Sequence, residues 1–151
     1  MVTPNYNMDG FLEQTLESVT SQGYPNLEYI VIDGGSTDGS LEIIKRYEKY
    51  LTYWISEPDN GLYDALTKGF AKTTGEIMLW INSDDMLHKH SLFTLAQIFT
   101  DLPEVHWLTG GQVTYDEESR SVGLFRSISI SKYHYFSGDF FWIQQESTAW
   151  R

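Results

Sequence analysis

The segment at residues 77–87 constrains the fold most strongly, because an unbroken apolar run there ends abruptly in acidic side chains. Five apolar residues, 77–81, are typical of a strand covered on both faces, as in a parallel sheet between helices. The run ends in Asn82, Ser83, Asp84 and Asp85. Ligands of open α/β sheets bind outside the carboxyl ends of the strands, and two carboxylates there can hold a divalent cation that binds a phosphate. The simpler alternative is a turn with a helix N-cap, since aspartate suits both.

The same alternation of strand, polar loop and helix precedes this segment. Residues 1–4, 27–32 and 51–56 are expected strands, and helices are expected over 9–21 and 40–50. A third helix carries Leu62, Ala65, Leu66, Gly69 and Phe70 on its inner side. With short loops and right-handed crossovers, this order predicts an α/β fold: a mostly parallel sheet with helices on both faces.

The chain changes character after Asp85. A helix is expected over residues 89–100, a strand over 105–109 and a short helix over 131–137. Residues 112–115 and 121–125 bracket a polar turn and predict a hairpin, which would be a small antiparallel addition to the sheet. Trp54, Trp80 and Trp107 lie in apolar strands and are expected in the core.

Composition limits the classes of function. A chain of 151 residues suits a single domain with a real core. A formal charge of -11 argues against a nucleic-acid surface, which needs a basic patch. A phosphate-bearing ligand would therefore need a cation or a helix N-terminus. The sequence has no cysteine, so disulfides and thiolate sites are excluded, and no apolar run reaches membrane-spanning length.

The loop at residues 33–40 is the second candidate for ligand binding. Its glycines permit close backbone approach or positive φ. Ser36, Thr37 and Asp38 can accept hydrogen bonds from the amides that open the next helix. Asp9 is expected to cap the helix after the first strand. A plain connection between strand and helix is an equally good interpretation of this loop from the residues alone.

Taken together, these segments resemble the family 2 inverting glycosyltransferases, which have the GT-A nucleotide-sugar transferase fold. Residues 3–7 (TPNYN) are similar to the family's first strand-end motif, and 33–40 (DGGSTDGS) to its DxSxDxS-type motif. Asp59-Asn60-Gly61, Ala65, Lys68-Gly69 and Thr74-Gly75-Glu76 follow its central helix pattern. Residues 82–84 (NSD) stand where the DxD metal motif falls, although Asn82 replaces the first Asp and supplies no charge.

The resemblance implies a function and roles for individual residues. It implies transfer of a hexose-type sugar from a nucleotide-diphosphate donor, most simply a UDP-sugar, with inversion. The acceptor would be a saccharide or a lipid-linked molecule, in cell-surface polysaccharide synthesis. Mn²⁺ or Mg²⁺ would bind at Asp84, with Asp85 as the second candidate. The general base would be Glu146, with Asp139 as runner-up. The donor would contact Pro4, Tyr6, Asp33, Asp59, Asn82 and Ser83.

Alternatives to this function remain open. One is a nucleotide-sugar binding module without activity, because a fold alone does not give chemistry. A phospho-acceptor domain of flavodoxin-like build would want a lysine at the end of a late strand, and none is evident. A surface glutamate is the simpler interpretation of Glu146. Both chain ends look cut, so we expect residues 1–151 to be one GT-A catalytic domain truncated at both ends. The resemblance also implies a cytoplasmic location, free or peripheral at the inner face of the membrane.

Overall fold

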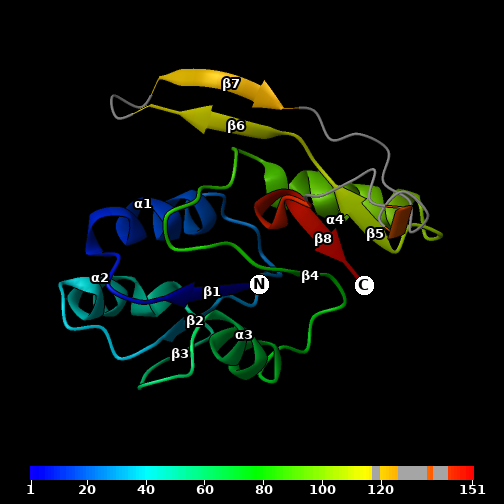
Figure 1. Ribbon diagram of the computed structural model, residues 1–151. Coiled ribbons are helices and arrows are strands. Elements are labelled where there is room, and N and C mark those ends of the chain that lie inside the picture. Colours follow the sequence, from blue (N-terminus) through cyan, green and yellow to red (C-terminus); the bar gives the residue numbers. More distant parts are fainter. Residues whose placement is uncertain (117–119, 126–135, 138–142) are drawn as a thin grey trace.

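The computed structural model describes residues 1–116, 120–125, 136–137 and 143–151 (Figure 1). The first part alternates strands and helices: β1 (Val2–Asn5), α1 (Asp9–Thr20), β2 (Ile30–Asp33), α2 (Ser40–Tyr47), the 3-10 turn η1 (Glu48–Tyr50), β3 (Tyr53–Ser56), α3 (Leu62–Phe70) and β4 (Met78–Leu79). The second part contains α4 (Ser91–Asp101), β5 (Trp107–Thr109), β6 (Gln112–Tyr115), β7 (Ser121–Phe125), the 3-10 turn η2 (Gln145–Ser147) and β8 (Thr148–Trp150).

The described strands form three sheets, one parallel and two antiparallel. Strands β1, β2 and β3 pair in parallel in that order. A parallel bridge between Val2 and Trp80 brings the end of β4 alongside β1, and the Ile81 N–H donates to the Val2 carbonyl oxygen at 3.1 Å. Strand β8 pairs antiparallel with β4 and β5, and β6 and β7 form the expected hairpin. The predicted fold class, a mostly parallel sheet with an antiparallel addition, is confirmed.

Helices cover both faces of the parallel strands. On one face α3 packs on alternate strand residues, in a cluster of Val2, Ile30, Ile32, Ala65 and Leu66. The opposite face packs against α1, α2 and α4, through residues that include Leu12, Leu16, Val31, Ile44, Ile81 and Phe99. Coverage on both faces explains why residues 30–32 of the central strand β2 are apolar without alternation. Each fully buried Leu or Ile side chain contributes about 1.5–3 kcal/mol.

Several elements differ in detail from the sequence prediction. The strand expected over residues 77–81 is paired only at Met78–Leu79, because Trp80 makes a single bridge and the chain turns soon afterwards. Leu62 is 41% exposed, since it opens α3 at the sheet edge. Most of the short helix expected over 131–137 and the runner-up base Asp139 lie outside the described residues.

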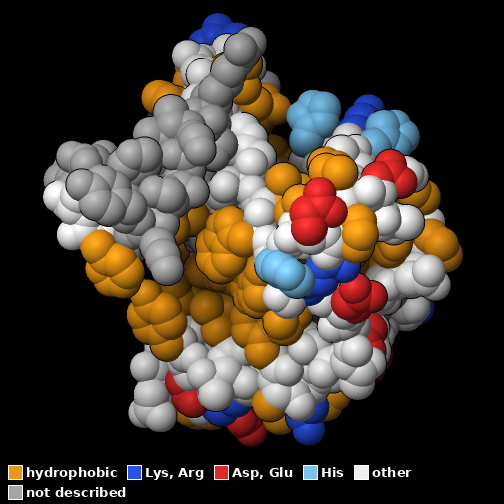
Figure 2. Space-filling model, turned by 90° about the vertical axis from the view of Figure 1, so that its right-hand side faces the viewer, with side chains coloured by type: hydrophobic (Ala, Val, Ile, Leu, Met, Phe, Trp, Pro, Cys, Tyr) orange, Lys and Arg blue, Asp and Glu red, His pale blue; other side chains and the backbone are white. Residues whose placement is uncertain are grey.

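The prediction that Trp107 belongs to the core is wrong. Its side chain is 52% exposed, because β5 is the outermost strand beside β8. The Trp107 ring stacks on Trp150 with 5.9 Å between centroids, and Phe70 lies against the same Trp150 ring. Hydrophobic side chains gather on the side of the molecule that carries β5 and β8 (Figure 2). Trp54 and Trp80 do pack against the two core clusters.

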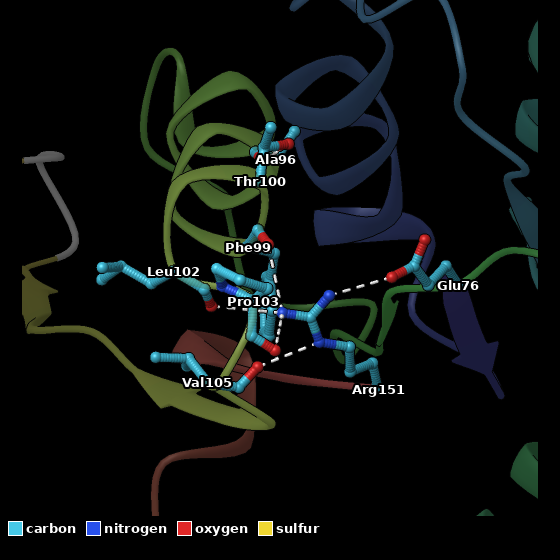
Figure 3. A network of polar contacts seen from close by, with 8 residues as sticks. All are labelled: Glu76, Ala96, Phe99, Thr100, Leu102, Pro103, Val105 and Arg151. Atoms are coloured by element: carbon cyan, nitrogen blue, oxygen red, sulfur yellow. Dashed lines mark hydrogen bonds and ion pairs between the residues drawn. The ribbon is translucent and has the colours of Figure 1, made fainter.

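Arg151 ties the antiparallel strands to the C-terminal end of α4 (Figure 3). Its guanidinium donates to the carbonyl oxygens of Phe99, Leu102, Pro103 and Val105 and pairs with Glu76 at 2.9 Å. Carbonyls at a helix C-terminus lack partners within the helix and attract a cation. This contact fixes β8, which directly follows the turn that carries Glu146.

Among the residues that the structure describes, none of the helices is both long and apolar enough to cross a membrane.

Replacing Gly69 by alanine should destabilise the fold. A Cβ at this position of α3 would lie 2.4 Å from Val2 Cγ1 and 3.3 Å from Ile32 Cγ1, so helix and sheet would have to separate. We expect Gly69→Ala to lower the free energy of unfolding by about 1–3 kcal/mol, measured by urea denaturation. Gly10→Ala in α1 is the matched control, because a Cβ there meets nothing within 4 Å. Equal unfolding midpoints for Gly69→Ala and the parent would contradict the packing described.

Candidate functional site

The three parallel strands end in polar residues that lie side by side. The register pairs Asn5 at the end of β1 with Asp33 at the end of β2, and Asp33 with Ser56 at the end of β3. Parallel strands present their carboxyl ends at the same edge of the sheet, where ligands of such folds bind. The three side chains are therefore brought together by strand register alone.

Asp33 is fully buried and accepts four hydrogen bonds. Asn5 Nδ2 (2.7 Å) and Ser36 Oγ (2.5 Å) donate to Oδ1, and the Ser36 N–H (3.0 Å) and Ser56 Oγ (2.6 Å) donate to Oδ2. Burial opposes ionisation of this carboxyl, but the donors outweigh it, so the pKa of Asp33 is lowered. Asp33 thus acts here as an ionised anchor for the loop. The contact of Asp33 with a base or ribose stays a prediction. It would require the hydrogen-bond donors around this buried carboxylate to move away.

The loops after β1 and β2 are bonded to each other. Asn7 has the left-handed φ of 52°, its N–H donates to Ser36 Oγ at 2.8 Å, and its Oδ1 accepts from the Thr37 N–H at 2.8 Å. The Asp9 N–H donates to Asp38 Oδ2, and Asp9 Oδ2 accepts from the Gly39 N–H. Asp9 is therefore the first residue of α1 and not its cap, which is Met8. Asp38 accepts from the Ser40 N–H as predicted, whereas Ser36 Oγ accepts from the Asn7 N–H instead of from an amide of α2. The acceptor role of Thr37 stays a prediction.

The glycines of the second loop let a third loop approach. A Cβ on Gly34 would lie 3.0 Å from Asp59 Oδ2, and Gly35 has a φ of 79°. Asp59 is half-buried, and its Oδ1 accepts from the Gly61 N–H at 2.8 Å. Both uses predicted for the glycines, close backbone approach and positive φ, are confirmed.

The acidic loop, residues 82–85, follows β4 and lies on the side of β1 that faces away from β2. Asn82 Nδ2 donates to Asp85 Oδ2 at 3.2 Å, and the Asp85 N–H bonds the Asn82 carbonyl oxygen at 3.3 Å, which makes a compact turn. Ser83 is buried, Asp84 is exposed, and Asp85 is half-buried. Asn82 thus donates a hydrogen bond to Asp85, whereas an aspartate at position 82 would add a third negative charge beside Asp84 and Asp85.

Glu146 belongs electrostatically to this acidic loop, although it is about sixty residues away in the chain. Burial raises its pKa, and the negative charges of Asp85 and Asp84 raise it further. Burial and the charge of Asp84 likewise raise the pKa of Asp85, which the hydrogen bond from Asn82 partly offsets. Among the described residues, none donates a hydrogen bond to the buried Glu146 Oε2. Strand β8 runs antiparallel to β4, so the turn before β8, which carries Glu146, lies at the end of β4 where the acidic loop begins. The metal and base roles of Asp84, Asp85 and Glu146 stay predictions.

The remaining predicted residues differ in their access to a ligand. Tyr6 is 62% exposed in the loop after β1, whereas Pro4 is buried within β1. Sequence reasoning missed Asn5 and Ser56, the two donors to Asp33 that lie outside its own loop. The signal for them was the strand register, since each is the last residue of a strand beside β2.

The acidic loop has the residues expected of a site where a cation is bound partly by the protein and partly by a substrate. Among residues 1–116, 120–125, 136–137 and 143–151, no three His, Asp or Glu side chains converge closely enough to hold a metal ion by themselves. Mg²⁺ is usually bound by one or two carboxylates together with substrate phosphates and water. The carboxylates of Asp84 and Asp85 are of the ligand type that a shared site of this kind uses.

Comparison with known proteins agrees with this geometry. The family model described as Glycosyl transferase family 2 matches residues 1–148. An uncharacterised glycosyltransferase of Mycobacterium tuberculosis is 40% identical over 87 residues, which are 56% of this chain and 33% of that protein. The chain spans about a third of the length of the first curated relatives that it matches.

Two solved structures share the fold. Staphylococcus aureus TarS residues 1–349, solved with UDP-GlcNAc, has a TM-score of 0.68 at 24% identity, over 81% of this chain and 36% of that 1–349 chain. The mannosyltransferase PcManGT of Pyrobaculum calidifontis, solved with GDP-Man and Mn²⁺, has a TM-score of 0.64 at 26% identity, over 72% of this chain and 34% of that one. The expected GT-A fold is confirmed.

The raised pKa values of Asp85 and Glu146 give a pH prediction for the metal-free protein. Both carboxyls should titrate above the values of exposed Asp and Glu in a carbon-detected NMR titration. Because the folded state binds these protons more tightly than the unfolded chain, their contribution to stability should fall as pH rises through the folded pKa. Asp33 acts in the opposite sense: its stabilising contribution should be lost as pH falls through its lowered pKa.

One substitution and one added metal ion make the NMR titration more specific. Asn82→Ala removes a donor to Asp85 and should raise the pKa of Asp85 further. Saturating Mg²⁺ should lower the pKa values of both Asp85 and Glu146, because a cation favours the charged form. Titration of both groups at or below their ordinary values without metal would show that the cluster does not form.

Proposed function

The chain belongs to glycosyl transferase family 2, and from that premise we propose that it carries the catalytic site of a metal-dependent inverting glycosyltransferase. The donor is a nucleotide-diphosphate sugar, most simply a UDP-sugar, and the acceptor is a saccharide or lipid-linked molecule in cell-surface polysaccharide synthesis. The observation that carries the proposal is the antiparallel pairing of β8 with β4, which brings the turn of Glu146 to the end of the sheet where Asp84 and Asp85 follow β4, beside the bonded loops after β1 and β2. Residues 1–151 are, in this proposal, part of one catalytic domain.

The nucleoside end of the donor binds on the β1 and β2 side of the edge. Tyr6 offers an exposed ring for stacking, and Asp59 offers a half-buried carboxylate for ribose hydroxyls. Pro4 and Asp33 contribute chiefly by fixing the backbone around them, and Asn82 and Ser83 lie toward the sugar and phosphates. The UDP-GlcNAc complex of TarS supports a uridine donor, whereas PcManGT was solved with GDP-Man.

The phosphate end binds at the acidic loop together with Mn²⁺ or Mg²⁺. In a protein with a formal charge of -11, the diphosphate and Asp84 repel each other unless a cation lies between them. Asp84 is exposed and provides the first carboxylate ligand, and Asp85 provides the second. When bound, the ion neutralises the charge that develops on the leaving diphosphate. The Mn²⁺ in the PcManGT complex supports this part of the proposal.

Glu146 acts as the general base. Its carboxylate takes the proton of the acceptor hydroxyl while that oxygen bonds to the anomeric carbon, and the bond from that carbon to the diphosphate oxygen breaks. Attack from the face opposite the leaving group inverts the configuration. Burial and the nearby Asp charges make Glu146 a better proton acceptor than an exposed glutamate. Its Oε2 is free of described hydrogen-bond donors and so has capacity to accept the proton.

Binding of UDP should depend on a divalent cation. We expect calorimetric titration with UDP to show strong binding in Mn²⁺ and a sharp loss of affinity in EDTA. Asp84→Asn should behave like removal of the metal. Asp101→Asn is the control, because it removes the same charge at the exposed end of α4. Equal UDP affinity with and without metal would refute the metal role, and tighter binding of GDP than of UDP would change the nucleotide assigned.

Removal of the base should slow transfer without weakening donor binding. Loss of a general base costs about 10²–10⁴-fold in rate, so Glu146→Gln should reduce UDP release from UDP-sugars by this factor in the intact protein supplied with saccharide acceptors. Its UDP affinity should stay near the parental value, and exposed Glu104→Gln should change neither quantity. A Glu146→Gln variant at the parental rate would remove Glu146 from the mechanism. Binding without any transfer or hydrolysis would favour the inactive binding module.

A further inference from the structure

Helix α1 presents a line of polar side chains to the acidic loop. Thr15, Ser18 and Gln22 are spaced by three and four residues, so they lie on one side of the helix and its continuation. All three bond to the chain between Ser83 and Leu92. The apolar residues of α1, such as Leu12 and Leu16, belong to the core. One side of α1 thus packs in the core, and the side with Thr15 and Ser18 contacts the segment after β4.

Thr15 makes the contacts nearest to the proposed metal ligands. Its side chain is fully buried, and its Oγ1 donates to the carbonyl oxygens of Ser83 at 2.9 Å and Asp85 at 2.7 Å. These two carbonyls are on either side of Asp84 in the chain. Since Asp84 is itself exposed, the place of its carboxylate depends on the backbone that Thr15 holds.

Ser18 and Gln22 extend the same attachment. Ser18 Oγ accepts from the Leu87 N–H at 3.1 Å. Gln22 Oε1 accepts from the Leu92 N–H at 3.0 Å, and Gln22 Nε2 donates to the His88 carbonyl oxygen at 3.4 Å. Leu87 also packs into the core. The loop is thus fixed at several points along its length, and the point at Thr15 adjoins both Asp84 and Asp85.

We propose that Thr15, supported by Ser18 and Gln22, is a positioning residue that fixes the acidic loop so that Asp84 and Asp85 meet the cation of the donor complex. This inference rests on the proposed function. Groups that orient metal ligands typically contribute about 10–100-fold to metal affinity. Substituting a residue that only stabilised the fold would leave metal affinity unchanged. Fewer molecules would be folded, but those that fold would keep the geometry of the acidic loop.

The test compares Thr15→Val, which keeps the shape and removes the hydroxyl, with Thr15→Ser, which keeps the hydroxyl. We expect Thr15→Val to weaken Mn²⁺ binding in the presence of UDP by about 10–100-fold, with UDP affinity in EDTA unchanged. Thr15→Ser should restore most of the Mn²⁺ affinity. Thr20→Val is the matched control, since the Thr20 hydroxyl bonds only to Leu16 of its own helix among the described residues.

The outcomes separate this inference from the proposed function. Parental Mn²⁺ affinity in Thr15→Val, or an equal loss in Thr15→Ser and Thr15→Val, would overturn the positioning role alone. Absence of metal-dependent UDP binding in the parent would overturn the proposed function and this inference with it. If Thr15→Val does not fold, Ser18→Ala decides by the same two titrations, with a loss of Mn²⁺ affinity expected and a parental value contradicting the proposal.

Discussion

The buried carboxylate of Asp33 imposes the constraint on which the edge of the sheet depends. A buried ionised group is costly unless hydrogen bonds satisfy it, and the structure supplies four donors from Asn5, Ser36 and Ser56. Those donors come from the ends of the two strands that flank β2 in register and from the loop that follows β2. Satisfying one charge therefore fixes the relative positions of three strands and one loop. Loss of a single donor would weaken the other hydrogen bonds of this network as well.

From this anchor, β1 and α1 connect the two halves of the proposed donor site. Asn7, before α1, and Asp9, the first residue of α1, bond the loop after β2. The middle of α1 holds the acidic loop through Thr15. One continuous segment of chain thus positions both the nucleoside side and the metal side. Such preorganisation lowers the cost of assembling a site when its ligand binds.

The apolar runs and the polar loops between them were enough to predict the order of strands and helices and the acidic edge. The sequence did not predict the features that depend on contacts between residues distant in the chain. Asn5 and Ser56 are ordinary polar residues until strand register places them beside Asp33. Thr15 resembles a residue of a solvated helix face, and yet it is buried. Trp107 is apolar but lies on an outermost strand, so hydropathy alone assigned it wrongly to the core.

The most direct test of this account is a crystal structure of the protein with UDP and Mn²⁺. The account predicts the diphosphate at the edge formed by the ends of β1, β2 and β4, with the cation on Asp84 and the acidic loop still bonded to Thr15. Glu146 should face the side from which an acceptor approaches. A nucleotide bound at another face of the sheet, or a cation coordinated without Asp84 and Asp85, would contradict it.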